Sequence, residues 1–350
     1  FQGEWITYKI KDVLSIGNGR DYKHLNNGGI PVFGTGGYMT SVDECLYDGE
    51  TTFIGRKGSI NKPFYYNGKF WTVDTLFYTH SFNGITPKFT YCLFQTINWL
   101  KYNEASGVPS LSKDTIEKIK INIPKLEEQN KIAKLMFALD ERIATQNKII
   151  EDLKKLKSAI IEKLYSEIQG KEYSYRQLFD VVNERNKQME YSNILSASQE
   201  KGMINRDDLN LDIQFERSNI NTYKIVRAGD YVIHLRSFQG GFAFSDKSGV
   251  CSPAYTILRP NSFLEYSYLS NYFTSQRFIK SLIIVTYGIR DGRSINVDEW
   301  LSMKITIPSK EHQQYIVKMI GSFDRKIESE EAYTIHLSKQ KQYILRQMFI

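Results

Sequence analysis

Two long stretches of this 350-residue chain repeat apolar residues at the spacing of a helix that packs along another helix. Their inward positions, most of them apolar, alternate between steps of four and three residues, which predicts a coiled-coil helix of roughly 40 residues and ~60 Å in each stretch. In the first stretch these positions are Ile132, Met136, Leu139, Ile143, Gln146, Ile150, Leu153, Lys157, Ile160 and Leu164. In the second stretch they are Ile316, Ile320, Phe323, Ile327, Glu330, Thr334, Leu337, Lys341, Ile344 and Met348.

The two stretches are copies of one another. A shift of 184 residues aligns 121–166 with 305–350 without a gap, and 13 of these 46 positions are identical. Both copies begin with Ile-x-Ile-Pro, in which the proline marks the first turn of the helix. Internal duplication explains the match, and two related units in one chain predict a pseudo-twofold arrangement with antiparallel helices.

Both predicted helix seams have polar residues at the same two places, Gln146 and Lys157 in the first copy and Glu330 and Lys341 in the second. Counting heptads for an antiparallel pair places Lys157 opposite Glu330 and Lys341 opposite Gln146. We expect these contacts to mark the register of the two helices, because polar residues in an apolar seam select one alignment. The alternative is that all four side chains are solvated at a ragged seam.

The repeat extends weakly upstream of each helix. Residues 110–124 match 294–308, and both segments contain a helix-capping residue (Ser112 or Asn296), a short helical turn and a strand. Farther back, "DGETTFIGRKG" at 48–58 matches "AGDYVIHLRSF" at 228–238, which predicts in each half a strand that ends in an arginine loop. Each half is therefore expected to be an α/β domain followed by a long helix, giving an α+β or mixed fold class.

These patterns predict the domain boundaries. Residues 1–3, Phe-Gln-Gly, look like the remnant of a cleaved expression tag. The expected order is a first domain at 4–124, a central repeated helix at 125–170, a second domain at 171–308 and a C-terminal repeated helix at 309–350.

Composition adds only broad limits. Hydrophobic residues make up 41% and charged residues 24%, and no apolar run approaches the ~18 residues of a membrane span. A net charge of +7 permits a nucleic-acid partner without requiring one. The three cysteines and five histidines are scattered, which predicts neither a zinc site nor disulfides and makes a reducing cytoplasm the default location.

The doubled motif at the helix entrances carries a family resemblance. It reads Ile-Pro-x-x-Glu-x-Gln-x-x-Ile at 123–132 and again at 307–316, followed by Leu-Asp-x-x-Ile at 139–143 and Phe-Asp-x-x-Ile at 323–327. With the segments "PVFGTGGYMTS" and "FWTVDTLFYT" at 31–41 and 70–79, the chain resembles the specificity (S) subunit of type I restriction-modification systems.

The resemblance implies a division of labour between subunits. Each target recognition domain would read half of a bipartite double-stranded DNA site, while the helices set the spacer and dock two methyltransferase subunits that restriction subunits then join. S-adenosylmethionine, Mg²⁺ and ATP would bind to those partners. The chain itself lacks an Asn-Pro-Pro-Tyr or Asp-Pro-Pro-Tyr tetrapeptide and a phosphate-binding Walker motif, and "FGTGGY" at 33–38 reads as a turn between strands. We therefore expect a non-enzymatic subunit without catalytic or metal-binding residues.

Two sets of residues are candidates for contacts with these partners. The DNA-binding candidates are Asn18, Arg20, Tyr38, Arg56, Lys57, Arg236, Ser237, Gln239, Tyr287, Arg290 and Arg293. They are loop residues whose side chains suit base edges or phosphates, and the alternative for each is a solvated loop position or a local salt bridge. The candidates for methyltransferase docking or helix pairing are Glu127, Gln129, Ile132, Leu135, Met136, Phe137, Leu139, Glu311, Gln313, Ile316, Ile320 and Phe323.

Two other functions remain open at this stage. A coiled-coil protein-interaction scaffold would use the helices without reading DNA, and a self-contained DNA methyltransferase or nuclease would act without partners. DNA binding that depends on salt would argue against the first. Methyl transfer or cleavage by the purified chain would support the second.

Overall fold

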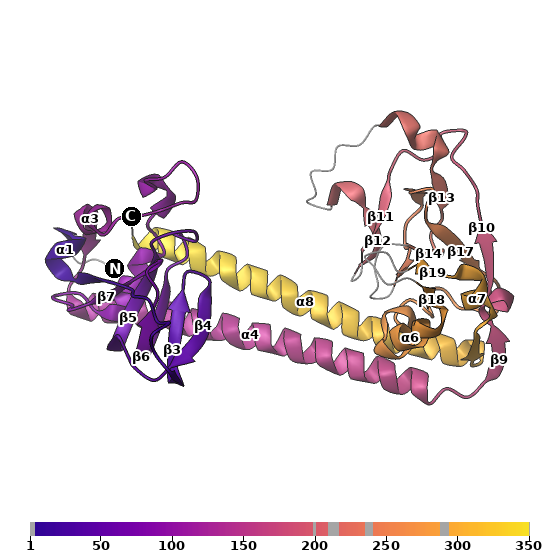
Figure 1. The fold of residues 1–350 in the computed structure, drawn as a ribbon, viewed down its shortest axis with the longest axis horizontal. Coiled ribbons are helices and arrows are strands. Elements are labelled where there is room, and N and C mark those ends of the chain that lie inside the picture. Colours follow the sequence, from indigo (N-terminus) through magenta and orange to yellow (C-terminus); the bar gives the residue numbers. More distant parts are fainter. Residues whose placement is uncertain (1–3, 199–200, 209–216, 235–240, 288–293, 350) are drawn as a thin grey trace. The chain divides into compact units, whose positions relative to one another are not determined.

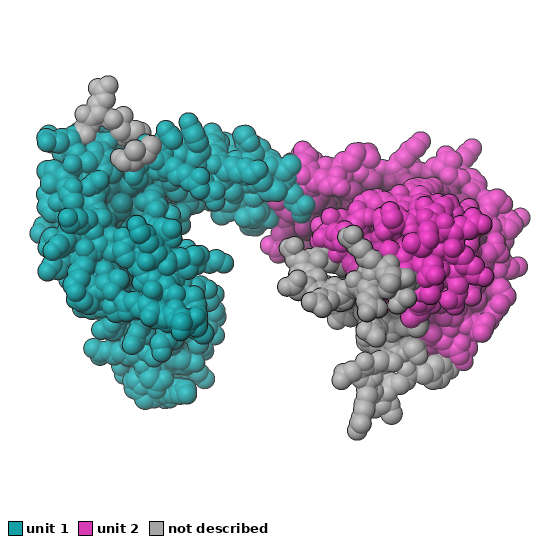
Figure 2. Space-filling view, turned by 90° about the horizontal axis from the view of Figure 1, so that it is seen from above, with its two compact units in different colours: residues 1–148, 331–350 teal, residues 149–330 magenta. Residues whose placement is uncertain are grey.

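The structure is a computed structural model that describes residues 4–198, 201–208, 217–234, 241–287 and 294–349 (Figure 1). The chain divides into two compact units (Figure 2). Unit 1 comprises residues 1–148 and 331–350, and unit 2 comprises residues 149–330. Each unit therefore contains one globular domain, one half of the central long helix α4 (Leu126–Ser166) and one half of the C-terminal long helix α8 (Lys310–Met348).

The first domain runs from β1 to β8 and is centred on a six-stranded sheet. The strand order is β2-β7-β5-β6-β3-β4, and the neighbours are antiparallel except for β3 and β6. Strands β1 and β8 form a separate pair that leads into α4. The elements are β1 (Ile6–Lys9), α1 (Ile10–Val13), β2 (Ser15–Asn18), β3 (Asn27–Gly34), β4 (Gly37–Val42), β5 (Tyr47–Gly55), β6 (Phe64–Thr72), β7 (Leu76–His80), α2 (Pro87–Phe94), η1 (Trp99–Tyr102), α3 (Lys113–Lys118) and β8 (Lys120–Ile123).

The second domain runs from β9 to β20 and has smaller sheets. Its largest sheet has the order β10-β17-β14-β15, and β9 pairs with β20 beside the start of α8. Its strands are β9 (Lys171–Ser174), β10 (Phe179–Val182), β11 (Leu195–Ser198), β12 (Gly202–Asn205), β13 (Lys224–Val226), β14 (Tyr231–Ile233), β15 (Phe242–Phe244), β16 (Gly249–Cys251), β17 (Thr256–Pro260), β18 (Thr286–Tyr287), β19 (Ser294–Ile295) and β20 (Lys304–Ile307). Its α-helices are α5 (Tyr175–Leu178), α6 (Gln276–Ser281) and α7 (Val297–Ser302), and its 3-10 helices are η2 (Arg206–Asp208), η3 (Arg217–Thr222), η4 (Tyr272–Thr274) and η5 (Leu282–Val285).

The predicted repeat is confirmed in the elements that enter the long helices. Helix α3 and strand β8 have the same bounds as α7 and β20 after a shift of 184 residues, and α4 and α8 begin at equivalent positions. Both predicted caps are present, because Ser112 accepts from the amide of Thr115 (3.2 Å) and Asn296 accepts from the amide of Glu299 (3.3 Å). Local capping signals therefore decide where these short helices start.

The two long helices run antiparallel within each unit, as predicted, but the partners of the seam lysines were predicted wrongly. Lys341 pairs with Asp140 in unit 1, and Lys157 pairs with Asp324 in unit 2. The expected partners were Gln146 and Glu330. Each aspartate directly follows a seam position, so the lysine stem stays in the apolar seam while its ammonium reaches a carboxylate at the edge.

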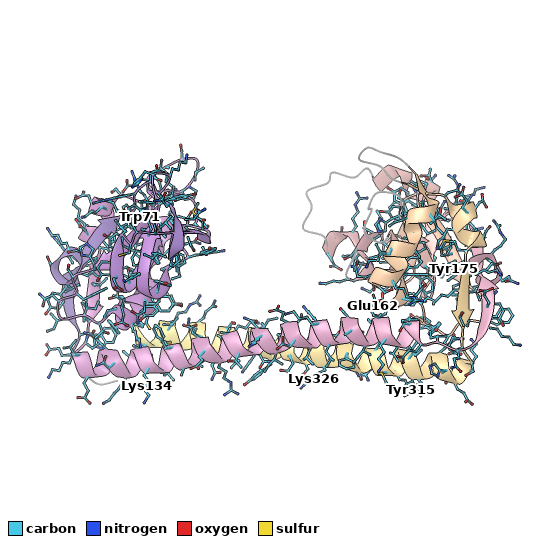
Figure 3. All side chains as sticks on the ribbon, turned by 60° about the horizontal axis from the view of Figure 1, so that its bottom comes forward. Trp71, Lys134, Glu162, Tyr175, Tyr315 and Lys326 are labelled. Carbon is cyan, nitrogen blue, oxygen red and sulfur yellow. The ribbon has the colours of Figure 1, made fainter. Side chains whose placement is uncertain are left out.

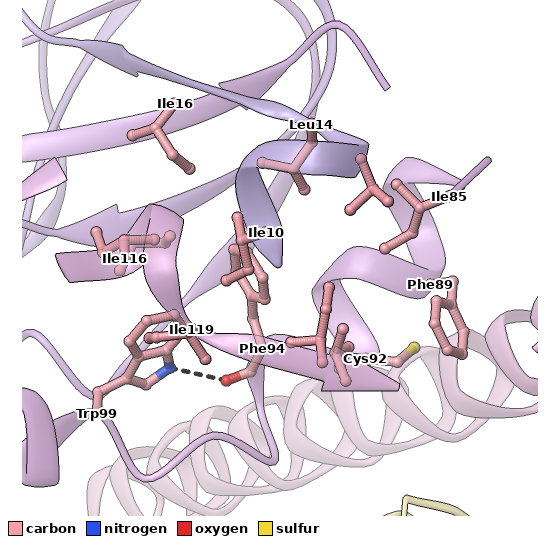
Figure 4. Close-up of a cluster of buried hydrophobic side chains, with 14 of the residues drawn as sticks. Ile10, Leu14, Ile16, Ile85, Phe89, Cys92, Phe94, Trp99, Ile116 and Ile119 are labelled. Atoms are coloured by element: carbon pink, nitrogen blue, oxygen red, sulfur yellow. Dashed lines mark hydrogen bonds between the residues drawn. The ribbon is translucent and has the colours of Figure 1, made fainter. Parts of the chain in front are cut away.

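Each globular domain packs against the start of one long helix and the end of the other. The core of the first domain includes Ile132 and Met136 of α4 together with Leu345 of α8. Within this core the indole N–H of Trp99 donates to the carbonyl of Phe94 (2.8 Å; Figure 4). The core of the second domain combines its own side chains with residues from both helices. These helix residues are Ile161, Tyr165, Ile316 and Ile320.

Candidate nucleic-acid interface

Several loops of the first domain converge at one end of its six-stranded sheet. Arg20 follows β2, and its amide donates to the carbonyl of Thr72 at the end of β6 (2.8 Å). Arg56 follows β5, and its amide donates to the carbonyl of Thr75 (2.8 Å), which also accepts from Lys57 (3.3 Å). The turn between β6 and β7 thus holds the backbones of both arginine loops, and Asn18 ends β2 beside them.

Tyr38 lies at the same end of the sheet. The segment at 33–38 is a turn between β3 and β4, as predicted, and Tyr38 is the strand partner of Phe33. The carbonyl of Phe33 accepts from the amide of Val73 in the β6–β7 turn (3.1 Å). Tyr38 is 64% exposed, and its hydroxyl lies 3.1 Å from the Ser41 hydroxyl. Every DNA-binding candidate of the first domain therefore belongs to this group of loops.

A further loop, at residues 103–111, was missed by the sequence analysis. The side chain of Asn103 organises it by accepting from the amides of Ala105 (3.1 Å) and Ser110 (2.9 Å). The loop adjoins the Arg56 loop, because the amide of Gly58 donates to the carbonyl of Pro109 (2.8 Å). The composition "NEASGVPS" indicates a loop, but nothing local in the sequence places it beside Arg56.

Arg56 and Lys57, at this end of the six-stranded sheet, have hydrogen-bond donors that could contact a ligand. One guanidinium nitrogen of Arg56 donates to the carbonyl of Asp74 (3.2 Å), which uses a small part of the five N–H donors of an arginine. Lys57 is exposed. Burial raises the pKa of Tyr78, and the positive charge of Arg20 opposes that rise.

The candidates of the second domain lie outside the described residues or lack a described side chain. Arg236, Ser237 and Gln239 fall between β14 and β15, and Arg290 and Arg293 fall between β18 and β19. Tyr287 lies in β18, and its side chain is not described.

β14, the strand that precedes Arg236 in the sequence, belongs to a well-bonded part of the second domain. β14 corresponds to β5 of the first domain, and each is an inner strand of its sheet. The guanidinium of Arg259 donates to both carboxylate oxygens of the buried Asp230 (2.9 and 3.0 Å), which raises the pKa of Arg259. Burial lowers the pKa of His234, whose amide donates to the carbonyl of Gly241 (2.7 Å).

The repeated glutamines of the helix entrances bind their own domains. The Gln129 amide donates to the carbonyls of Gly84 and Pro124 (both 2.9 Å) and accepts from the amide of Thr86 (2.9 Å). Gln313 does the same with Phe263 (3.0 Å), Pro308 (3.1 Å) and Glu265 (2.8 Å). Because both side chains are at most 1% exposed, they hold a domain on its helix and leave no surface for a partner subunit.

The other partner-binding candidates on the long helices differ in how far their side chains are buried. Ile132, Met136, Ile316 and Ile320 are buried in the domain cores. Phe137 packs edge-on against Tyr65 and Tyr91 of the first domain. Leu139 and Phe323 are half-buried, whereas Glu127, Leu135 and Glu311 are exposed. Lys134 and Tyr315, labelled in Figure 3, lie on the same exposed parts of the helices.

Within the described part of the chain, no cluster of His, Cys, Asp or Glu side chains has the arrangement of a metal site. No helix in that part is long and apolar enough to cross a membrane.

Comparisons with known proteins assign a family. A family model described as "Type I restriction modification DNA specificity domain" matches residues 2–155 and 170–338. The type I restriction enzyme MjaVIII specificity subunit of Methanocaldococcus jannaschii is 26% identical over 86% of this chain and 76% of its own length. The putative MjaX specificity subunit of the same organism is 25% identical over 75% of this chain and 67% of its own length.

Solved structures agree at the level of the fold. The S subunit of a type I restriction-modification system from M. genitalium has a TM-score of 0.61 at 14% identity, and the match covers 100% of this chain and 97% of that one. A chain from a structural study of type I complex assembly gives a TM-score of 0.62 at 14% identity, covering 100% and 98% of the two chains. With a duplicated domain and helix matched by two copies of the family model, this chain belongs to the specificity subunits of type I restriction-modification systems, which recognise DNA and are not themselves catalytic.

Proposed function

We propose that this chain reads a bipartite double-stranded DNA target. Each domain would recognise one half-site, and the two long helices would set the spacer and dock two methyltransferase subunits, which restriction subunits join. Methylation and cleavage would then occur on those partners. The observation that carries the proposal is the duplication itself, since one chain presents two related domains, each anchored on both long helices.

The loops at one end of the first domain support a role in base readout. Asn18, Arg20, Tyr38, Arg56 and Lys57 come from three separate places in the sequence and share one end of a sheet. Arginine pairs with guanine and asparagine with adenine in the major groove, whereas lysine and tyrosine more often contact phosphates. A group of such side chains on a rigid sheet is suited to reading a few adjacent base pairs.

The exposed parts of the helices are the proposed docking surface for the methyltransferase. Of the original candidates we retain Glu127, Leu135 and Glu311, because they are exposed. Gln129 and Gln313 are no longer proposed for this role, since their side chains are buried and bonded within the chain.

The test is to lengthen both helices together. Seven residues would be inserted between Lys148 and Ile149 of α4 and seven between Glu330 and Glu331 of α8, where the chain passes from one unit to the other. A heptad keeps the seam in phase and adds ~10 Å. The complex with its methyltransferase subunits should then select a spacer about three base pairs longer, at ~3.4 Å per base pair, with both half-sites unchanged.

Other results would contradict the proposal. New bases in either half-site would mean that the helices do more than set a distance. DNA binding that does not weaken with salt, or no binding by the complex, would favour the interaction scaffold. Methyl transfer by the chain alone would favour a self-contained enzyme.

A further inference from the structure

Lys341 occupies an unusual position near the end of α8. Its side chain is 10% exposed, and its ammonium pairs with Asp140 of α4. The same ammonium donates to Oε1 of Gln95 (2.8 Å) and lies 5.7 Å from the centre of the Tyr91 ring. Gln95 is the C-terminal cap residue of α2, so one buried cation touches both long helices and the first domain.

The equivalent lysine in the second copy is placed differently. Lys157 pairs with Asp324 of α8 and is 21% exposed. Among the described residues, it forms no hydrogen bond to the second domain. That domain is held on α4 by other groups, because Glu162 accepts from the amides of Gln276 (2.8 Å) and Arg277 (3.3 Å) at the start of α6 (Figure 3). The lysine–aspartate ion pair is therefore present in both copies. Among the described residues, only Lys341 also forms a side-chain hydrogen bond to a globular domain, through Gln95.

A buried ammonium restricts geometry more than an apolar contact does. Leu345 of α8 and Phe349, which follows the helix, also pack against the first domain. Apolar side chains, however, keep most of their contact energy when one surface slides over another. A buried charge must keep its hydrogen-bond partners, because leaving them costs the desolvation of an unpaired ion. The observed placement of the first domain on the helices satisfies Asp140 and Gln95 together.

We infer that Lys341 is a positioning residue, which fixes the first domain at one angle on the helix pair through Gln95 and so sharpens the spacer length that the complex accepts. The inference rests on the proposed function. Lys341 contacts no DNA in this scheme, and it acts through the orientation of the domain that carries Arg20 and Arg56. Loss of the link leaves the bases of both half-sites unchanged and widens the range of accepted spacers.

The experiment measures spacer choice. The full chain, assembled with its methyltransferase subunits, would select DNA from a pool in which both half-sites and the spacer length vary. The readout is the ratio of bound sites with the wild-type spacer to bound sites one base pair longer or shorter. We expect Lys341→Met and Gln95→Leu to lower this ratio about fivefold or more, the lower end of typical coupling between sites. Gln95→Leu breaks the link while Asp140 and Lys341 stay paired.

Matched variants separate positioning from stability. Gln95→Glu keeps an oxygen acceptor for Lys341 and should retain the wild-type ratio. Lys157→Met removes the equivalent ion pair in unit 2 and should leave the ratio close to wild type. The double variant Asp140→Asn/Lys341→Met leaves neither charge of the ion pair unpaired. Its stability should therefore be higher than that of Lys341→Met, while the complex still accepts a wide range of spacer lengths. Should Lys341→Met fail to fold, Gln95→Leu tests the same link.

Two results would overturn the inference. One is an unchanged spacer ratio in Gln95→Leu. The other is a decrease of this ratio in Lys157→Met as large as in Lys341→Met, which would assign the effect to the helix pair. If the wild-type complex selects no bipartite site, the proposed function itself fails. If it selects one and the variants do not change the ratio, only the role of Lys341 fails.

Discussion

The side-chain amide of Gln129, in the first turns of α4, donates to the main-chain carbonyl of Gly84 (2.9 Å), 45 residues earlier in the chain. The repeated Gln313 forms the equivalent bond to Phe263 (3.0 Å), 50 residues earlier. These contacts tie each globular domain to the helix that follows it. They give the repeated motif a structural role that is separate from any partner subunit.

Replacement of either glutamine should therefore destabilise the chain. Gln129→Leu removes three hydrogen bonds, which join this side chain to the half-buried amide of Thr86 and to the carbonyls of Gly84 and Pro124, and this loss should cost about 1–3 kcal/mol. Gln313→Leu should act similarly in unit 2. Urea denaturation would measure both effects, with the exposed Glu127→Ala as the control within about 0.5 kcal/mol of wild type. Wild-type stability combined with lost methyltransferase binding would instead support a docking role.

Gly19 should tolerate no side chain. A Cβ there would lie 1.9 Å from the carbonyl oxygen of Val73, which is backbone and cannot rotate away. Gly19→Ala should thus destabilise the chain by about 1–3 kcal/mol and displace the turn that holds Arg20 and Arg56. Gly29→Ala is the control, because its Cβ would meet no atom within 4 Å. Equal thermal stability of the two variants would contradict the close approach.

Arg56 and Lys57 should differ in their effect on DNA binding. Arg56→Ala should weaken binding by about 1–3 kcal/mol and relax the preference at one base pair of one half-site. Lys57→Ala should weaken all sequences alike and reduce the slope of log K against log salt by about one. Competition binding with single-base variants of the selected site, at several salt concentrations, would distinguish them. A uniform loss in Arg56→Ala would assign Arg56 to phosphate contact instead.

His234 should make the stability of the second domain depend on pH. Burial lowers the pKa of its imidazole in the folded chain. As the pH falls below about 6.5, the ordinary pKa of histidine, the unfolded chain therefore binds a proton before the folded chain does. The free energy of unfolding decreases until the pH reaches the lowered pKa of His234 in the folded chain. His234→Asn should reduce the difference in melting temperature between about pH 7.5 and about pH 5.5. His312→Asn, at an exposed position of α8, is the control, and an unchanged difference in His234→Asn would refute the assignment.

The sequence predicted the elements whose signals are local. The Ile-x-Ile-Pro entrances, the Ser112 and Asn296 caps and the apolar spacing of the helices each act over a few residues, and they located α3, α4, α7 and α8. The turn at 33–38 and the strand before Arg56 were also correct, because glycine turns and alternating strands follow local backbone rules. The roles of the candidate residues in DNA and partner binding remain predictions.

The duplicated pattern alone was sufficient for the fold class and the antiparallel helices, since spacing and copy number can be read along one dimension. The partners of Lys157 and Lys341 could not be predicted from this pattern. A heptad repeat shows which side of a helix faces its neighbour, but it does not determine how far the two helices are shifted along their axes. The same holds for Gln129, whose bonds to Gly84 and Thr86 exist only once the first domain has folded onto α4. Stagger and domain placement follow from packing side chains that are distant in sequence, and the buried Gln129, Gln313 and Lys341 have their hydrogen-bond partners in that packed arrangement.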